Sequence, residues 1–263
     1  MIYSAEQIEQ ITREESKVLN NLIKLRMTLF SQLAPTLESD RAQEYLLHGI
    51  CRRLDVLHHC IRNVFDIFPV SRENLLTDVE KRNLEINLHA FTINIYGLLD
   101  NVAWVFIFEN SLEGKIRGGR RSIGLFSRHT MKYFPERTKQ YLNSKRIKAW
   151  YRDYAKNYRD ALAHRIPPYI PPYSVAPEDV QQYKYYETKI SELLIAGDVD
   201  SIDKLRDDQA SIRSICGAFL HSYYDFDASR PVMFHAQMLA DSNTVIEVIS
   251  IVILEKNKEI YNA

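Results

Sequence analysis

Apolar residues recur at intervals of three and four along most of this chain, which is the period of an amphipathic helix. The first run covers residues 5–33. It begins after Ser4, with Gln7 three positions later as in a capping box, and it stops at Pro35. A second run covers residues 45–68 and stops at Pro69. The pattern therefore predicts two long helices in the first part of the chain.

A third run, from about Asp78 to Phe106, is apolar on most of its circumference, which predicts a central, buried helix. Four of the eight glycines lie between residues 113 and 124 and predict a loop after that helix. The helical pattern resumes after Pro135 and is strongest over residues 144–165. The prolines of residues 166–173 then favour an extended conformation.

Further helices are predicted from Pro177 onward, over residues 210–223 and over residues 243–261. We find no internal repeat and no long linker. The sequence therefore predicts one all-α domain built as a helical bundle. Its most apolar stretch, residues 245–254, is about half as long as a membrane span and contains Glu247, which predicts a core segment and no membrane anchor.

The composition is typical of a globular protein. The chain has 263 residues, of which 46% are hydrophobic and 26% charged, enough to bury a core and too apolar for a disordered chain. Its three cysteines have no paired spacing, which predicts reduced thiols. The first residues lack the basic and apolar segments of a signal peptide, so we expect a cytoplasmic protein.

Charge is segregated along a chain whose net charge is zero. Residues 114–165 contain fifteen Lys and Arg residues and three acidic residues, a net charge of +12 that the rest of the chain balances. A basic segment with a glycine loop is suited to bind the phosphates of RNA, DNA or a nucleotide. The alternative is that its charges pair with the acidic remainder of the chain or cover a solvated helix face. The residues predicted to bind RNA phosphate are Lys115, Arg117, Arg120, Arg121, Arg128, Arg152, Lys156 and Arg165.

Residues 151–165 contain the candidate catalytic side chains. On a helix, a polar stripe lies beside an apolar one, and it consists of Asp153, Asn157, Asp160 and His164. Asp160 and His164 are four residues apart, so we expect a hydrogen bond that fixes the imidazole tautomer and favours its protonated form. Arg159 adds a permanent, forked charge. A histidine that activates the ribose 2′-OH and an arginine that stabilises the phosphorane suffice to cleave RNA without metal.

The hexapeptide Arg159-Asp-Ala-Leu-Ala-His164 resembles the RxxxxH motif of HEPN domains (higher eukaryotes and prokaryotes nucleotide-binding). Tyr158 before it and His-Arg-Ile-Pro-Pro-Tyr-Ile-Pro-Pro at its end resemble a bacterial branch of that superfamily. The likeness extends over residues 78–172, with a weaker likeness at residues 234–244. HEPN domains are small helical bundles. The resemblance therefore implies a HEPN-like core at residues 78–172, with helical extensions at residues 1–70 and 178–263.

Catalytic HEPN domains are metal-independent endoribonucleases that usually dimerise so that two motifs form one site. The resemblance therefore implies that Arg159 and His164 are the catalytic residues of this chain. Asp160, the third predicted catalytic residue, stands where the family most often has Asn, and a carboxylate there repels the scissile phosphate. Because positions five apart on a helix diverge by about 140°, we expect a site shared across a homodimer. The alternative is a helix-end histidine that only caps carbonyl groups.

Two other pairs in the sequence have the same spacing. Arg53 and His58 lie in a strongly apolar helical run, and Arg230 and His235 enclose a proline, which disfavours both pairs. Cysteine and histidine residues at positions 48–60 lack the spacing of a zinc site, so no metal and no cofactor is predicted.

Several polar residues are candidates for a supporting role around the motif. They are Asn94, Asp100, Asn101, Asn157 and Tyr158. Asn87, Asn94 and Asn101 repeat every seven residues and share one face of the central helix. Their amides either contact the helix of His164 or a partner, or are buried and hydrogen-bonded within the chain.

The sequence thus favours a cytoplasmic, metal-independent endoribonuclease of HEPN type that acts as a homodimer on RNA, with an antitoxin or regulatory protein as a further candidate partner. The alternative is a non-catalytic HEPN-like module that binds nucleotide, RNA or a protein partner with the same basic surface. Catalysis requires an exposed His164 close to Arg159 or its symmetry mate. A binding module tolerates either residue being buried or turned away.

Overall fold

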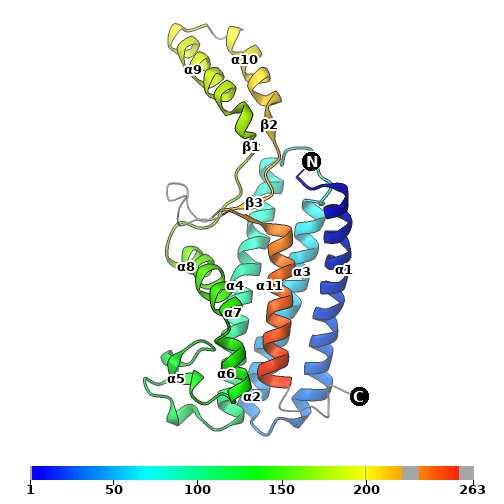
Figure 1. Ribbon diagram of the computed structural model, residues 1–263, viewed down its shortest axis with the longest axis vertical. Coiled ribbons are helices and arrows are strands. Elements are labelled where there is room, and N and C mark those ends of the chain that lie inside the picture. Colours follow the sequence, from blue (N-terminus) through cyan, green and yellow to red (C-terminus); the bar gives the residue numbers. More distant parts are fainter. Residues whose placement is uncertain (1, 199, 221–230, 255–263) are drawn as a thin grey trace.

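The structure, a computed structural model, describes residues 2–198, 200–220 and 231–254. Its long helices lie side by side in an elongated bundle, with shorter helices beside one end and a helical hairpin projecting beyond the other (Figure 1). The strands among the described residues are two residues long. The predicted all-α fold is therefore confirmed.

The bundle contains α1 (Ala5–Thr28), α2 (Asp40–Glu44), α3 (Arg52–Ile67), α4 (Asp78–Glu109) and α11 (Phe234–Ile249). Beside it lie α5 (Arg128–Met131), α6 (Glu136–Leu142), α7 (Lys145–Ala149) and α8 (Lys156–His164), and the hairpin is α9 (Val180–Ala196) and α10 (Asp200–Ser211).

Shorter elements connect these helices. Four are π-helical, namely η1 (Leu29–Leu33), η3 (Tyr45–Cys51), η6 (Trp150–Ala155) and η8 (Ser250–Leu254). The 3₁₀ turns are η2 (Ala34–Thr36), η4 (Glu113–Lys115), η5 (Arg120–Ser122) and η7 (Pro177–Asp179). The strands are β1 (Ser174–Val175), β2 (Arg213–Ser214), β3 (Ala218–Phe219) and β4 (Val232–Met233).

The hydrophobic core forms around α4. This helix has buried apolar residues on most of its sides, as its sequence predicts. Helices α3 and α11 pack against α4, and α1 packs against both α3 and α11. Buried residues from Tyr3 to Leu254 form one core, so the two ends of the chain belong to the same bundle as the central helix.

Two segments, Asp78–Glu109 and Phe234–Leu254, are long and apolar enough to cross a membrane by composition alone. In each, 61% of the most apolar window is buried inside the protein. Such burial is typical of the core helices of soluble bundles. Burial in the core thus accounts for the apolar character of both helices.

The hairpin of α9 and α10 stands apart from this core. It is joined to the bundle where β1 pairs with β2 in antiparallel fashion, with Ser174 opposite Ser214. No residue of α9 is buried, and Tyr185, Leu194 and Ile195 are exposed. The stability of the bundle therefore depends little on this hairpin.

Two of the predicted helices have different bounds in the structure. The helix expected over residues 210–223 is wrong beyond Ser211, because the chain forms β2 and β3 and a bridge from Tyr169 to Leu220. Residues 221–223 lie outside the described part. Helix α11 begins at Phe234 and not at Asn243, because buried polar residues such as Asp241 interrupt its apolar pattern. Of the region predicted up to Tyr261, the structure describes residues as far as Leu254.

A buried histidine joins three segments of the bundle. The Tyr3 hydroxyl donates to Nδ1 of His235 at 3.2 Å, and Nε2 of His235 donates to the Phe68 carbonyl oxygen at 2.7 Å. Burial lowers the pKa of His235 to about 4, so the ring is neutral at pH 7. The histidine of this third RxxxxH pair is therefore a structural residue.

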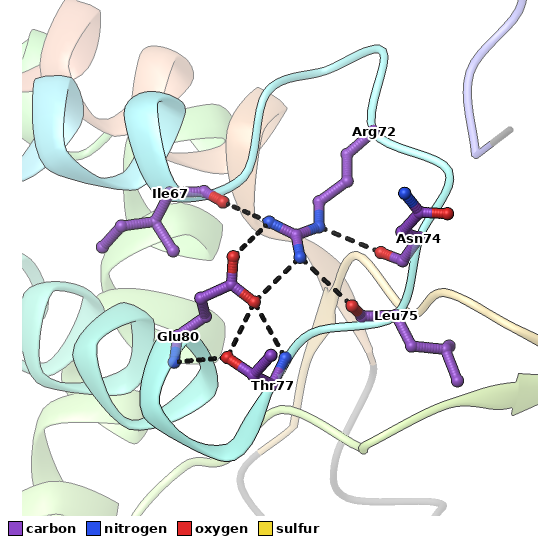
Figure 2. A network of polar contacts seen from close by, with 6 residues as sticks. All are labelled: Ile67, Arg72, Asn74, Leu75, Thr77 and Glu80. Carbon is purple, nitrogen blue, oxygen red and sulfur yellow. Dashed lines mark hydrogen bonds and ion pairs between the residues drawn. The ribbon is translucent and has the colours of Figure 1, made fainter.

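Arg72 organises the loop between α3 and α4 (Figure 2). Its guanidinium donates to the carbonyl oxygens of Ile67, Asn74 and Leu75 and to both carboxylate oxygens of Glu80. Glu80 in turn forms a capping box with Thr77, the N-cap of α4. The hydrogen bonds from Arg72, together with those from Thr77, lower the pKa of Glu80 to about 2.

We expect Arg72→Met to lower the melting temperature by roughly 5 °C near pH 7, because the loop loses five hydrogen bonds. Because the pKa of Glu80 is lower in the folded protein than its ordinary value of 4.5, the ionised carboxylate stabilises the fold fully above pH 4.5. This stabilisation is lost as the pH falls to about 2. The difference between variant and wild type should therefore shrink over that range in thermal melts followed by circular dichroism. The control is Arg13→Met, which breaks an exposed ion pair with Glu9. If the melting temperature of Arg72→Met stays below that of wild type by the same amount at every pH, the role of Glu80 is contradicted.

Candidate functional site

The candidate catalytic residues lie on one continuous helical segment, α7–η6–α8, which runs along α4 (Figure 1). Ser144 caps its start by accepting a hydrogen bond from the Ile147 amide. Tyr158 and Ala161 are buried on its inner face, and the Tyr158 hydroxyl donates to the Phe219 carbonyl oxygen at 3.2 Å. The segment ends at His164, after which Arg165 leaves helical geometry.

Arg159 lies against α4. Its guanidinium carbon is 4.0 Å from the centre of the Tyr96 ring, a cation–π contact, and its Nε is 3.2 Å from Oδ1 of Asp160. The side chain is 24% exposed, and no hydrogen bond of good geometry reaches its buried Nε among the described residues. Arg159 is therefore held in place and still has an edge open to solvent.

Asp100 is a carboxylate on α4 that interacts with the charges of Arg159 on α8 and Arg53 on α3. Burial raises its pKa, and the positive charges of Arg159 and Arg53 oppose that rise. Asp100 thus lies electrostatically between an arginine of α8 and an arginine of α3. The supporting role of Asp100 stays a prediction, and the charges that act on this carboxylate are those of two arginines.

Aromatic side chains cover the same region. The hydroxyls of Tyr96 and Tyr151 are 3.1 Å apart, and the ring of Phe126 stacks on Tyr151 with centroids 3.9 Å apart. Gly124 lies nearby, because a Cβ on it would be 3.6 Å from Oδ1 of Asp100. The loop that follows the glycine-rich run therefore packs beside Asp100.

The expected hydrogen bond between Asp160 and His164 is not formed. Oδ2 of Asp160 instead accepts from the Lys156 ammonium at 2.8 Å, while Oδ1 faces Arg159. Burial alone would raise the pKa of Asp160, but the contacts with Lys156 and Arg159 bring it below its ordinary value. The reason is geometric: both cations reach the carboxylate from its own helix, one a full turn earlier and one adjacent.

His164 is the last residue of α8 and is exposed. Within the described residues, no hydrogen bond or ion pair connects it to Arg159, which points toward Tyr96 on α4. Five positions on a helix correspond to a turn of about 140°, so the two side chains leave the helix in different directions. One chain therefore does not bring the arginine and the histidine together.

The chain after His164 is tied down by α4. Nε2 of His89 is 2.6 Å from the Pro168 carbonyl oxygen, and the Ile170 amide donates to Oε1 of Glu85 at 2.9 Å. These contacts fix the direction in which the chain leaves α8. Neither His89 nor Glu85 stands out in the sequence, because both lie within the long apolar run.

The asparagines of α4 face α3 and not α8. Arg53 of α3 donates from Nε to Asn101 and from Nη1 to Asn94, each at 2.8 Å. Of the other predicted supporting residues, Asn157 accepts a hydrogen bond from Arg165 at 2.7 Å. The sequence marks Arg53 as the arginine of a disfavoured RxxxxH pair, and it does not predict the contact of Arg53 with Asn94 and Asn101.

The residues predicted to bind RNA phosphate are all exposed. Arg120 pairs with Glu113, Arg152 with Asp153 and Lys156 with Asp160, whereas Lys115, Arg117 and Arg121 form no ion pair within the described residues. The loop and α5 lie beside α6, at the end of the molecule opposite the hairpin (Figure 1). The cations of this loop and of α5 therefore lie nearer to the start of α7 than to His164, whereas Lys156 and Arg165 lie at the two ends of α8.

A buried carboxyl group anchors the π-helical segment η6 to α11. Oδ1 of Asp241 accepts from Trp150 Nε1 and from Gln237 Nε2, both at 2.8 Å. Burial raises the pKa of Asp241 to about 7 against these hydrogen bonds. Because η6 runs directly into α8, this contact helps to set the position of Arg159.

Comparison of the chain with protein-family models, with curated proteins and with solved structures gave no match. The resemblance to HEPN domains stays a prediction that rests on the residues of the motif.

We expect the free energy of unfolding of the wild type to fall as the pH rises, because Asp241 becomes charged, and we expect Asp241→Asn to abolish this fall. A folded-state pKa raised above the ordinary 3.8 means that the stabilising effect is complete below pH 3.8 and is lost as the pH rises through about 7. Asparagine keeps the Oδ1 acceptor and does not titrate. Between pH 5 and pH 8 the stability of the variant should therefore rise relative to wild type by on the order of 2–3 kcal/mol.

Urea unfolding at several pH values measures this difference. The matched control is Asp153→Asn, which alters an exposed carboxylate of η6, the segment that Asp241 of α11 contacts. Parallel pH profiles of Asp241→Asn and wild type would show that Asp241 does not titrate in this range.

Proposed function

We propose that the protein is a cytoplasmic, metal-independent endoribonuclease of HEPN type whose active site forms between two copies of the chain. The observation that carries the proposal is the division of roles on α8, where Arg159 is fixed against α4 and His164 is exposed at the helix end. A second chain related by a two-fold axis supplies the missing partner for each residue.

The chemistry follows from these two side chains. His164 accepts the proton of the ribose 2′-OH while the 2′ oxygen attacks phosphorus, and the bond to the 5′ oxygen breaks as the proton held by His164 passes to that oxygen. The Arg159 guanidinium stabilises the negative charge on the phosphorane. The products are a 2′,3′-cyclic phosphate and a 5′-hydroxyl. The exposed cations Lys115, Arg117 and Arg121 support the proposal, because they are available to the RNA backbone.

Asp160 takes a positioning role in this scheme. Its carboxylate holds Arg159 from one side and is balanced by Lys156, which reduces its repulsion of a phosphate. An antitoxin or regulatory protein that covers the exposed His164 fits the same arrangement.

A second candidate function is a non-catalytic module that binds nucleotide, RNA or a protein partner. It is favoured by the charge around Arg159, which faces the carboxylates of Asp160 and Asp100 within its own chain. An arginine neutralised in this way stabilises the fold and attracts a phosphate less strongly.

We expect the wild type to cleave single-stranded RNA in EDTA and to leave 2′,3′-cyclic phosphate ends. His164→Ala should lower the rate at least 100-fold, because proton transfer by a positioned side chain contributes roughly 10²–10⁴-fold. His59→Ala, which alters an exposed histidine on α3, is the matched control and should retain full activity. Salt-sensitive RNA binding without cleavage by the wild type would favour the binding module.

A mixing experiment tests whether the site is shared. Neither Arg159→Ala nor His164→Ala should cleave RNA alone, but an equimolar mixture that exchanges subunits should recover about a quarter of wild-type activity, since half of the dimers then contain one intact shared site. The readout is cleavage rate after mixing, with subunit exchange followed by tagged chains. Absence of recovery despite proven exchange would contradict the shared site.

A further inference from the structure

A groove of about 520 Å³ lies between η3, the start of α3 and the middle of α4. Its volume is within the range of small-molecule sites. The residues that line it include His48, Gly49, Arg52, Arg53, Asn94 and Asn101. None of the contacts of Arg159 or His164 described above involves the cations of this groove.

Arg53 forms the floor of the groove in a fixed orientation. Its Nε and Nη1 donate to Asn101 and Asn94, which lie seven residues apart on α4. Gly97 lies between them, and a Cβ at that position would come within 2.5 Å of the Arg53 guanidinium carbon. The guanidinium therefore lies flat on the backbone of α4, where only glycine leaves room for it.

A second glycine has the same role on the opposite side. Gly49 lies in η3, and a Cβ there would come within 2.9 Å of Cγ of Asn101. Glycine lowers helix stability, so a glycine inside a helix needs a packing reason. Gly97 therefore leaves room for Arg53 itself, and Gly49 leaves room for Asn101, which holds Arg53.

Polar donors remain free for a ligand in this groove. Among the described residues, no acceptor binds Nη2 of Arg53, and neither His48 nor Arg52, both exposed, takes part in a hydrogen bond or ion pair. Among the residues that the structure describes, Glu44 is the one carboxylate that lines the groove, and Asp100 balances part of the charge of Arg53 from α4. Two arginines and a histidine thus converge on one open space.

We propose that this groove binds the phosphate of a nucleotide, either free or within an RNA strand. A fixed arginine fork beside a second arginine matches the geometry and charge of a phosphate group. Tyr45, whose ring packs on Trp104, forms an aromatic wall of the groove against which a base can stack. The Asn101 amide, wedged against Gly49, adds a polar group beside that wall.

The proposal is independent of ribonuclease activity and is tested by binding. Isothermal titration of the full chain uses three probes: AMP, inorganic phosphate and a 5′-phosphorylated single-stranded RNA tetranucleotide whose 2′ oxygens are methylated so that the proposed ribonuclease cannot cleave it. Arg52→Gln should weaken binding of the nucleotide probes about tenfold, the effect of losing one charged contact. Gly49→Ala, which pushes Asn101 from its place, should weaken it as well. Arg13→Gln removes an equal charge from the surface of α1 and should leave binding unchanged.

The outcomes separate the two sources of the phosphate. Binding of both AMP and RNA supports a site that takes free nucleotide, and binding of RNA alone supports a strand site. Arg52 is exposed and unpaired within the described residues, so its variant should keep the wild-type melting temperature. The proposal is overturned by equal affinity for inorganic phosphate and AMP, by absence of binding to every probe, or by binding that Arg52→Gln leaves intact.

Discussion

Polar side chains in the packed middle of α4 need partners, because an unsatisfied polar group inside a protein costs free energy. Asn94 and Asn101 are satisfied by Arg53 of α3. Asp100 lies between the charges of Arg53 and Arg159. The same requirement therefore fixes α3 on one side of α4 and α8 on another, and it places both arginines. The candidate active site and the groove on α3 are two consequences of one constraint.

The sequence predicts the fold well wherever a helix has one apolar face. Ser4 begins α1 with the capping box expected from Gln7, and the run from Asp78 forms the buried central helix. Prediction fails where other forces decide. The strands at residues 213–219 depend on pairing with distant segments, and the start of α11 is hidden by the buried polar residues His235 and Asp241. Local periodicity contains neither kind of information.

The π-helical segment η6 explains why some side chains near the motif lie on another face than their sequence spacing predicts. In η6, the extra residue per turn shifts every later side chain relative to an ideal helix, so a face drawn at 3.6 residues per turn does not stay in register up to Asp160. The motif residues Arg159 and His164 lie on the predicted helix, yet their neighbours differ from expectation. The contact of Arg53 with Asn94 and Asn101 is not predicted by the sequence, because it forms only when α3 and α4 pack together.

The shared carboxylate also links the two arginine sites electrostatically. Arg53, Asp100 and Arg159 together have a net charge of +1, and both arginines reach Asp100 through a half-buried region where screening is weak. An anion bound at either arginine neutralises this group of charges and makes a second anion at the other arginine less favourable. If both proposed sites bind phosphate, a nucleotide in the groove of α3 opposes the binding of RNA phosphate at Arg159, unless the second chain of the proposed dimer contributes further positive charge. The basic segment of residues 114–165, with a net charge of +12, is the part of the chain able to contribute it.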